Sequence, residues 1–428
     1  MTTVEIITIG DELLIGQVVD TNSPWMAHEL NLIGFDVRYK TTVGDEECDI
    51  LDAFERALGR SQAVLVTGGI GPTKDDITKK TLCKFFNTSL VFDGKTLETV
   101  ATIVSGLGRE LNELTRNQAF VPNGCMVIQN RMGTAPITWF ETTRHCEGDS
   151  PKQSEQKVLV SMPGVPYEMK WAMSEEILPR LKAFFHPEDS ILHHTFWVKN
   201  YGESSLAMLL ETFENELPAS IKLAYLPTYG LIRLRLTGKG ADPEELSKQM
   251  DDQREKLLAC LDKDLVSEID EDMEMILDKQ LKEKNLTLAL AESCTGGKLA
   301  SLFTAIPGCS SYFKGGVVSY SNEIKQDLLS VDSSVLEKYG AVSQPVVEAM
   351  AAGAYKTFNA DCVIAVSGIA GPGGGTPEKP VGTVWIAVSC KGKIQSQLYH
   401  FSQNRESNIL RSCNNGIRML LEMINEQK

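Results

Sequence analysis

The stretch from Leu286 to Leu329 reads LTLALAESCTGGKLASLFTAIPGCSSYFKGGVVSYSNEIKQDLL. Its first apolar run stops at Glu292, and a pattern with helical spacing begins after the small residues Ser-Cys-Thr-Gly-Gly. This order predicts a buried strand, a tight turn and a helix, as in α/β proteins. Ser293 then lies at the turn, beside a helix N-terminus whose unpaired N–H groups can bind an oxyanion or a phosphate. The stretch therefore offers a place for a nucleophile.

Two further side chains follow a second apolar run, Gly316 to Tyr320. If the two runs form neighbouring strands, Tyr320 and Lys325 can meet Ser293 at one edge of the sheet. A lysine with a lowered pKa can serve as the base that activates a serine. No histidine lies between His194 and His400, so the lysine is the better candidate base. The alternative is that Ser293 only caps the helix, beside two flexible glycines.

The composition is that of a globular protein of two or three domains. Of the 428 residues, 42% are hydrophobic and 23% are charged. The net charge of −15 argues against non-specific binding to nucleic acid or to an anionic membrane. The chain has no run of about 18 apolar residues and no basic segment before its first short apolar run, so we expect a cytoplasmic location. The ten cysteines form no C-x-x-C pair, and neither a zinc site nor a disulfide framework is predicted.

Strands alternate with helices in the first part of the chain, which predicts a parallel sheet covered on both faces. The strand Ala63 to Val66 is followed by TGGIGPTKDD, which lacks the G-K-[ST] of a P-loop and the spacing of a dinucleotide fingerprint. Ligands bind at the carboxyl ends of such strands, where this loop offers bare backbone. Its candidate ligand-contacting residues are Gly68, Gly69, Gly71 and Thr73. Further on, the polar segment Thr142 to Lys157 predicts an exposed hairpin tip.

Four carboxylates follow the first and third strands of this predicted sheet. They are Asp11, Glu12, Asp75 and Asp76. If they gather at one rim, they suit a hard divalent cation such as Mg²⁺, Mn²⁺ or Co²⁺ that bridges phosphates. The alternative is that these acids are solvated helix caps and turn residues.

The later part of the chain adds a small α+β module and a second α/β region. The strand Cys362 to Val366 precedes a loop rich in glycine, so two such loops are expected to flank one cleft. Arg405 lies between a predicted strand and the last helix, where it can reach a phosphate; the alternative for it is a surface salt bridge. The candidate substrate-binding residues are Cys294, Thr295, Gly296, Gly297, Gly316, Ser367, Gly368 and Arg405.

The sequence resembles the CinA family of competence/damage-inducible proteins along essentially its whole length. GDELLIGQVVDTN, TGGIGPTKDDIT and MPGVPYEM resemble the family's molybdopterin-binding-like domain. AESCTGG, GGVVSYSNEIK and SGIAGPGGGTPEKPVGTV resemble its amidase domain, with Ser367 where threonine is usual. The resemblance implies a three-layer α/β domain in residues 1–185, a KH-type α+β module in 186–262 and an α/β amidase domain in 263–428.

The same resemblance implies a nicotinamide mononucleotide (NMN) deamidase that converts the carboxamide to the carboxylate, releases ammonia and needs no cofactor. Ser293 would be its nucleophile, assisted by Tyr320 and Lys325. The resemblance also implies a metal-dependent ADP-ribose pyrophosphatase in the first domain, and a homodimer. The middle module has Gly-Glu-Ser-Ser from Gly202 where an RNA-binding KH domain has its G-x-x-G clamp, so nucleic acid is not expected as a partner.

Two other functions remain open at this point. In one, the first domain holds a pterin or a nucleotide without chemistry, and the protein regulates DNA uptake or repair. In the other, the serine and lysine belong to a peptidase or a general amidase. The complete set of Ser293, Tyr320 and Lys325 favours the enzyme over the binding protein, because a binding role does not require all three.

Overall fold

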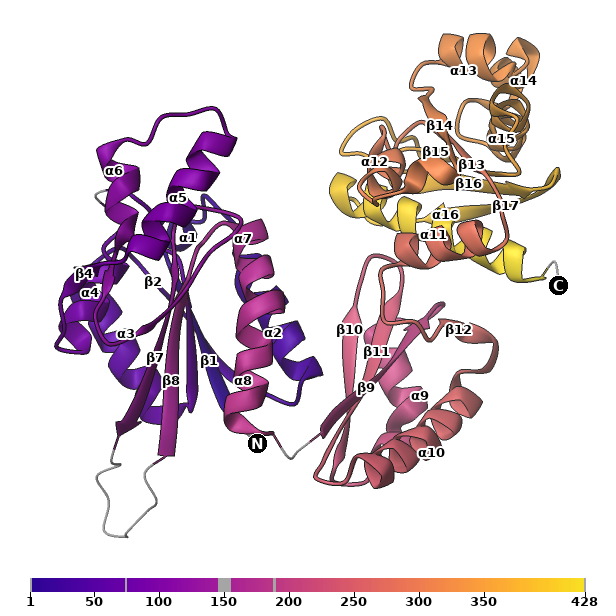
Figure 1. The fold of residues 1–428 in the computed structure, drawn as a ribbon. Helices are drawn as coiled ribbons and strands as arrows, with labels where there is room; N and C mark the ends of the chain where they lie inside the picture. Colours follow the sequence, from indigo (N-terminus) through magenta and orange to yellow (C-terminus); the bar gives the residue numbers. More distant parts are fainter. Residues whose placement is uncertain (1, 74, 145–154, 188–189, 427–428) are drawn as a thin grey trace. The chain divides into compact units, whose positions relative to one another are not determined.

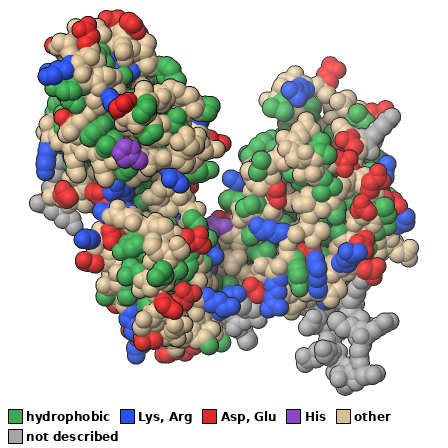
Figure 2. Space-filling model, turned by 180° about the vertical axis from the view of Figure 1, so that it is seen from behind, with side chains coloured by type: hydrophobic (Ala, Val, Ile, Leu, Met, Phe, Trp, Pro, Cys, Tyr) green, Lys and Arg blue, Asp and Glu red, His purple; other side chains and the backbone are tan. Residues whose placement is uncertain are grey.

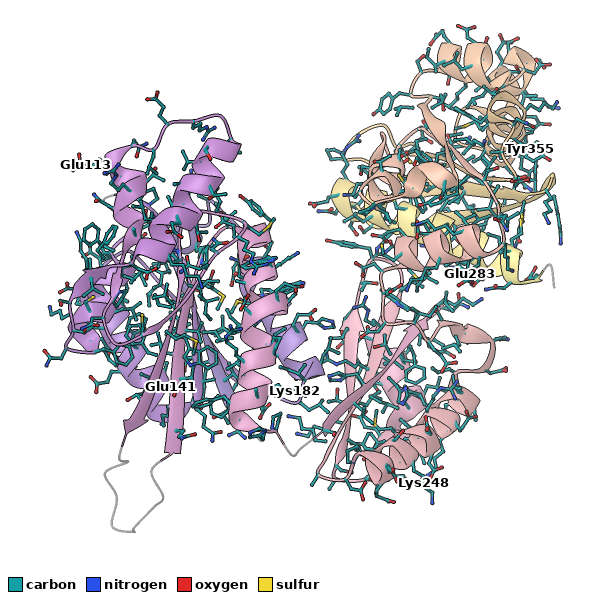
Figure 3. The ribbon with its side chains drawn as sticks, in the orientation of Figure 1. Glu113, Glu141, Lys182, Lys248, Glu283 and Tyr355 are labelled. Atoms are coloured by element: carbon teal, nitrogen blue, oxygen red, sulfur yellow. The ribbon has the colours of Figure 1, made fainter. Side chains whose placement is uncertain are left out.

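The computed structural model describes residues 2–73, 75–144, 155–187 and 190–426. It divides into two compact units, Met1–Leu192 with Gly238–Lys248 and His193–Thr237 with Gln249–Lys428. Both units combine sheets with helices (Figure 1), and side chains fill the space between sheet and helix (Figure 3). In Figure 2, acidic and basic side chains are interspersed over the visible face. The predicted domain boundaries after residues 185 and 262 stay predictions.

The first unit contains a six-stranded sheet in the order β2-β1-β3-β8-β7-β6. The bounds are β2 Asp36–Val43, β1 Thr3–Ile9, β3 Ala63–Thr67, β8 Glu155–Met162, β7 Ile137–Arg144 and β6 Met126–Ile128. The strands β2, β1, β3 and β8 are parallel, whereas β7 and β6 are antiparallel to their neighbours. The sequence predicts a parallel sheet, but the sheet is mixed, because β7 and β8 pair as an antiparallel hairpin. The sequence also predicts an exposed tip from Thr142 to Lys157, but residues 142–144 and 155–157 pair with one another in β7 and β8. The rest of the predicted tip, residues 145–154, lies outside the described residues.

Helices cover both faces of this sheet, which confirms the predicted three-layer α/β domain. Val4 and Ile6 pack with α2 (Asn22–Leu32) and with the helical segment formed by α7 (Pro166–Trp171), a π-helix (Ala172–Ile177) and α8 (Leu178–Phe185). Ile7 and Ile9 face the other way, toward α3 (Glu47–Arg60) and α4 (Thr78–Phe85). This alternation is the period of two that a strand buried on both faces requires. The unit also contains α1 (Asp11–Leu14), β4 (Leu90–Phe92), α5 (Gly94–Gly106), α6 (Glu113–Arg116) and β5 (Phe120–Pro122).

The predicted α+β module is a four-stranded sheet with two helices. Its strand order is β10-β11-β9-β12, with β10 Ile221–Pro227, β11 Ile232–Gly240, β9 Ser190–Val198 and β12 Leu265–Ser267. The helices are α9 (Glu203–Asn215) and α10 (Pro243–Leu261). The KH-type assignment of this module stays a prediction.

The C-terminal sheet has five strands in the order β14-β13-β15-β16-β17. The bounds are β14 Phe313–Val318, β13 Leu288–Glu292, β15 Cys362–Gly368, β16 Thr383–Cys390 and β17 Lys393–His400. The central strand β13 runs parallel to β14 and β15, while β16 and β17 are antiparallel to their neighbours. The carboxyl ends of the three parallel strands therefore meet at one edge of the sheet, where ligands bind in such folds.

Two sets of helices cover the faces of this sheet. Leu288 and Leu290 of β13 pack with α11 (Met273–Glu283), α12 (Lys298–Thr304) and α16 (Arg405–Glu426). Ala289 and Ala291 face α13 (Asn322–Leu329), α14 (Ser333–Tyr339) and α15 (Gln344–Phe358). Both faces are buried, as the uninterrupted apolar run of β13 predicts. No helix in the described part of the chain is long and apolar enough to cross a membrane.

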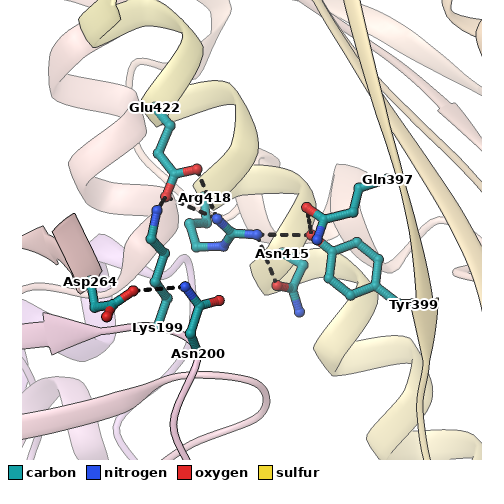
Figure 4. Close-up of polar contacts among 8 residues, drawn as sticks. All are labelled: Lys199, Asn200, Asp264, Gln397, Tyr399, Asn415, Arg418 and Glu422. Atoms are coloured by element: carbon teal, nitrogen blue, oxygen red, sulfur yellow. Dashed lines mark hydrogen bonds and ion pairs between the residues drawn. The ribbon is translucent and has the colours of Figure 1, made fainter.

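Within the second unit, the module packs against α16. Trp197 and Leu231 of the module belong to the same apolar cluster as residues of α11 and α16. Lys199 donates a hydrogen bond to Glu422 at 2.9 Å, and Arg418 donates to the same carboxylate at 2.8 Å (Figure 4). Arg418 also donates to the hydroxyl of Tyr399 in β17 at 2.8 Å. The last helix is thus bonded both to the module and to the edge of the C-terminal sheet.

Candidate active site

Ser293 lies directly after β13, in the turn that leads to α12. Its N–H donates to the carbonyl of Val366 in β15 at 3.0 Å, and its own carbonyl accepts from the N–H of Gly296 at 3.1 Å. Gly296 and Gly297 have φ angles of 60° and 96°, in the left-handed region that favours glycine. The predicted strand, turn and helix are all present, and the turn needs both glycines.

Lys325 of α13 is fully buried, and its Nζ lies 3.3 Å from the Oγ of Ser293. Burial lowers the pKa of this lysine below its ordinary value, because removing the amine from water disfavours its charged form. Three backbone carbonyls accept from the same Nζ and fix its position; they belong to Ser319 at 2.7 Å, Tyr320 at 3.3 Å and Ser321 at 3.4 Å. These carbonyls favour the ammonium form and so oppose the effect of burial. The pair resembles the serine and lysine of Ser-Lys hydrolases.

The lowered pKa predicts how the reactivity of Ser293 depends on pH. Only uncharged Lys325 can accept the serine proton, so the rate at which a fluorophosphonate labels Ser293 should rise as pH rises through the pKa of Lys325. The midpoint should lie below about 10.4, the ordinary value for lysine. The measurement is the labelling rate against pH, followed by mass spectrometry. The control variant Lys314→Met, which removes an exposed lysine of β14, should keep the same profile; a rate independent of pH in the parent would contradict the role of Lys325.

The structure places Tyr320 differently from the prediction that its side chain converges on Ser293. Its side chain is 62% exposed, and its hydroxyl accepts from Nη2 of Arg405 at 3.5 Å. In the described chain this hydroxyl forms no hydrogen bond with Ser293 or Lys325, and Tyr320 reaches the lysine through its backbone carbonyl. Arg405 also donates to the carbonyl of Gly371 at 2.8 Å. Among the described residues it has no acidic partner, so the surface salt bridge considered for it is not found.

A cavity of about 730 Å³ adjoins the turn after Ser293. It is lined by Thr295, Gly296, Gly297, Lys298, Ser301, Arg405, Glu406, Ile409 and Leu410. Four of the predicted substrate-binding residues therefore line one space. Cys294 is buried, and burial raises its pKa to about 12, which keeps the thiol protonated beside the serine.

Three other predicted substrate-binding residues do not line this cavity. Gly316 lies inside β14 opposite Leu290, where a Cβ atom would come within 3.1 Å of the leucine Cβ. A Cβ atom on Gly368 would come within 2.6 Å of Val384, so both glycines serve close packing. The hydroxyl of Ser367 donates to the carbonyl of Ala341 at 2.7 Å. Contact of these three residues with a substrate stays a prediction.

The N-terminus of α12 is occupied by Glu292, which the sequence did not single out. This buried carboxylate accepts from the N–H groups of Gly297, Leu299 and Ala300. The helix end expected to bind an oxyanion or a phosphate is therefore already bonded. Within the described chain, the N–H groups of Cys294 and Thr295 form no hydrogen bond to another residue, and they remain the candidates for an oxyanion.

A separate cavity of about 450 Å³ lies in the first unit, at the ends of β1 and β3. The glycine loop lines it with Gly68, Gly69 and Gly71, as predicted. A Cβ atom on Gly68 would lie 2.2 Å from the carbonyl oxygen of Ile9, so only glycine fits there. The acidic side chains that line it are Glu12, Asp20, Asp76 and Glu168. Thr73, Asp11 and Asp75 are not among the lining residues.

The four predicted metal ligands do not form one site. Asp76 accepts from the N–H groups of Gly71 at 2.7 Å and Thr73 at 2.9 Å, so its carboxylate closes the loop as a turn residue. Asp11 accepts from the N–H of Asp45 at 3.2 Å. Among residues 2–73, 75–144, 155–187 and 190–426, no group of three or more ligating side chains is placed to hold a metal ion. In this structure the four carboxylates are therefore not gathered around one point, and metal binding by them stays a prediction.

Asp45 is an acidic neighbour that sequence reasoning missed. Burial raises its pKa, and the carboxylates of Asp11, Glu12 and Asp75 raise it further. The acids of this rim are thus close enough to repel one another. No signal in the sequence marks Asp45, because it lies beyond β2 in a segment that the strand pattern reads as a plain connection.

The two parts of the chain match two different family profiles. Residues 270–424 match the CinA C-terminal domain, and residues 5–183 match the probable molybdopterin binding domain. A CinA-like protein of Cytophaga hutchinsonii is 43% identical over 405 residues, which cover 95% of this chain and 94% of that protein. A CinA-like protein of Flavobacterium psychrophilum is 41% identical over 421 residues, 98% of each chain. The crystal structure of competence/damage inducible protein CihA from Agrobacterium tumefaciens is 35% identical, covers 36% of this chain and 93% of that one, and gives a TM-score of 0.35.

Proposed function

Since the chain belongs to the CinA family, we propose that its C-terminal domain is an NMN deamidase. The observation that carries the proposal is the buried pair of Ser293 and Lys325, whose reactive atoms lie 3.3 Å apart. A serine beside a buried amine suits acyl transfer from a carboxamide. The adjoining cavity, with Arg405 in its wall, offers a place for a nucleotide.

In the first half of the reaction, uncharged Lys325 accepts the proton of Ser293. The serine Oγ then attacks the carboxamide carbon of NMN, and the carbonyl oxygen becomes an oxyanion. The N–H groups of Cys294 and Thr295, which donate to no other described residue, are the candidate donors to that oxyanion. Lys325 returns its proton to the leaving nitrogen, the C–N bond breaks, and ammonia departs from an acyl-serine.

In the second half, a water molecule replaces the ammonia. Lys325 accepts a proton from the water as its oxygen attacks the acyl carbon, and then returns a proton to Oγ of Ser293. The products are nicotinate mononucleotide and the regenerated serine, so NMN and water yield nicotinate mononucleotide and ammonia. The chemistry requires only groups of the chain and water.

The direct test is ammonia release by the purified full-length protein. Ammonia should appear with NMN and not with nicotinamide, which carries the same carboxamide without the phosphoribosyl group. Equal rates with both compounds would indicate a general amidase, and the absence of ammonia with NMN would overturn the proposal.

Arg405 is proposed to bind the 5′-phosphate, because an arginine pairs with phosphate through charge-assisted hydrogen bonds. Arg405→Ala should raise KM for NMN by about 10- to 100-fold, corresponding to the loss of about 1.5–3 kcal/mol. KM for nicotinamide riboside, which lacks the phosphate, should change by less than about threefold. Arg411→Ala changes an arginine of the same helix that does not line the cavity, and it should leave both constants near the parent values. Equal effects of Arg405→Ala on both substrates would remove the phosphate assignment.

The first domain is assigned a ligand-binding role in this proposal, supported by the cavity over its glycine loop. A metal-dependent ADP-ribose pyrophosphatase stays a prediction from the resemblance, as do the homodimer and the cytoplasmic location. The alternative that the whole chain is a regulatory binding protein predicts no turnover of NMN, so the ammonia assay separates the two.

A further inference from the structure

The buried carboxylate of Glu292 forms no ion pair with another described residue. It ends β13, is 1% exposed, and accepts from the N–H groups of Gly297 at 3.0 Å, Leu299 at 3.0 Å and Ala300 at 2.8 Å. A buried charge is costly unless it is hydrogen-bonded. Here the first N–H groups of α12 and the positive end of the helix dipole compensate the charge. A side chain held by three charge-assisted bonds is fixed in position.

These three bonds fix the turn that carries the nucleophile. Ser293 to Gly297 connect the end of β13 with the start of α12, and Glu292 bonds the last residue of the turn from the strand side. The left-handed glycines would otherwise allow several paths between strand and helix. The Glu292 side chain therefore sets where Ser293, Cys294 and Thr295 lie relative to the cavity.

The backbone of the same residue fixes the position of the base. The carbonyl of Glu292 accepts from Ser319 twice, from its N–H at 2.7 Å and from its hydroxyl at 3.2 Å. Ser319 is fully buried, and its carbonyl accepts from Nζ of Lys325 at 2.7 Å. Glu292 is thus bonded on one side to the nucleophile turn and on the other to the segment that holds the amine.

We infer that Glu292 is a positioning residue of this site. It holds the side chains of Ser293 and Lys325 close enough to react with each other, without touching the substrate. The substrate used in the test below rests on the proposed deamidase function. The positioning role itself is argued from the geometry alone. It also explains why the phosphate needs Arg405, since Glu292 occupies the helix N-terminus that could otherwise bind an anion.

The test is Glu292→Gln in the full-length protein. Glutamine keeps the size but removes the charge, and its NH₂ group meets backbone donors instead of accepting from them. We expect kcat for NMN to fall by about 10- to 100-fold, as for small misplacements of reacting groups, and KM to change by less than about threefold. The rate at which a fluorophosphonate labels Ser293 should fall by the same factor as kcat, and this readout does not require NMN.

A matched control separates positioning from loss of stability. Asp93 caps α5 in the first unit and accepts from the N–H of Thr96 at 2.7 Å. Asp93→Asn removes a charged helix cap far along the chain, so it should lower Tm without changing kcat or the labelling of Ser293. If Glu292→Gln also lowers only Tm, the inference is overturned. If Glu292→Gln does not fold, Glu292→Asp, which keeps the charge but shortens the side chain, should show the same fall in kcat and labelling, and parent values for it would overturn the inference.

The two proposals can fail separately. If the parent releases no ammonia from NMN while Glu292→Gln still slows the labelling of Ser293, the deamidase proposal fails and the positioning role stands. If the parent deamidates NMN and Glu292→Gln equals it in both readouts, the positioning role fails and the deamidase proposal stands.

Discussion

Replacing Ser293 with alanine is expected to lower kcat for NMN deamidation by about 10⁴-fold or more, with little change in KM. The variant keeps the cavity and Arg405 but has no oxygen to form the acyl intermediate. Removing the serine of a serine hydrolase typically leaves only the rate that binding and the oxyanion donors provide. The measurement is steady-state ammonia release with a range of NMN concentrations, supported by loss of fluorophosphonate labelling.

Ser310→Ala is the matched control, because it removes an exposed hydroxyl in the same domain. It should retain the parent kcat. If Ser293→Ala deamidates NMN at near the parent rate, the assignment of the nucleophile is wrong. Cys294 is not a ready substitute in that case, because its raised pKa of about 12 keeps the thiol protonated at neutral pH.

Replacing Lys325 with methionine is expected to lower kcat by about 10²- to 10⁴-fold, the usual contribution of a general base. Methionine fills much of the same volume but cannot accept a proton. The rise of activity with pH should disappear together with the amine. The measurement is kcat across the pH range, beside the labelling rate of Ser293.

Lys325→Arg distinguishes a base from a fixed positive charge. Arginine stays protonated in proteins, so it retains the charge and cannot serve as the base. The two variants should therefore be similarly inactive. An active Lys325→Arg protein would show that the site needs a cation beside the serine and would contradict proton transfer through the lysine.

The local order of the C-terminal site could be predicted from the sequence, because the signals are contiguous. The apolar run, the two glycines and the helical spacing around Ser293 specify strand, turn and helix within a few residues. The meeting of Ser293 with Lys325 followed from placing two apolar runs on neighbouring strands, and β13 and β14 are indeed paired. Chain order and hydrophobic pattern carry this information.

Side-chain directions could not be predicted, because they depend on partners far along the chain. The hydroxyl of Ser367 donates to Ala341, and the side chain of Tyr320 lies beside Arg405. Glu292 reads in the sequence as the polar end of an apolar run, yet its carboxylate accepts from N–H groups five to eight residues later. In the first unit, the carboxylate of Asp76 accepts a hydrogen bond from its own loop. The presence of several acids near one another in the sequence does not predict this bond.

The packing of the module on α16 limits how the chain can be shortened for study. Trp197 and Leu231 shield apolar side chains of α11 and α16, and each 100 Å² of apolar surface left exposed costs about 2.5 kcal/mol. A recombinant fragment that begins after residue 262 would retain Ser293 and Lys325 but lose this cover and the Lys199 bond to Glu422. Poor solubility of such a fragment would then report the missing module and not a defect of the catalytic residues, so a minimal soluble fragment should start near Ser190, where β9 begins.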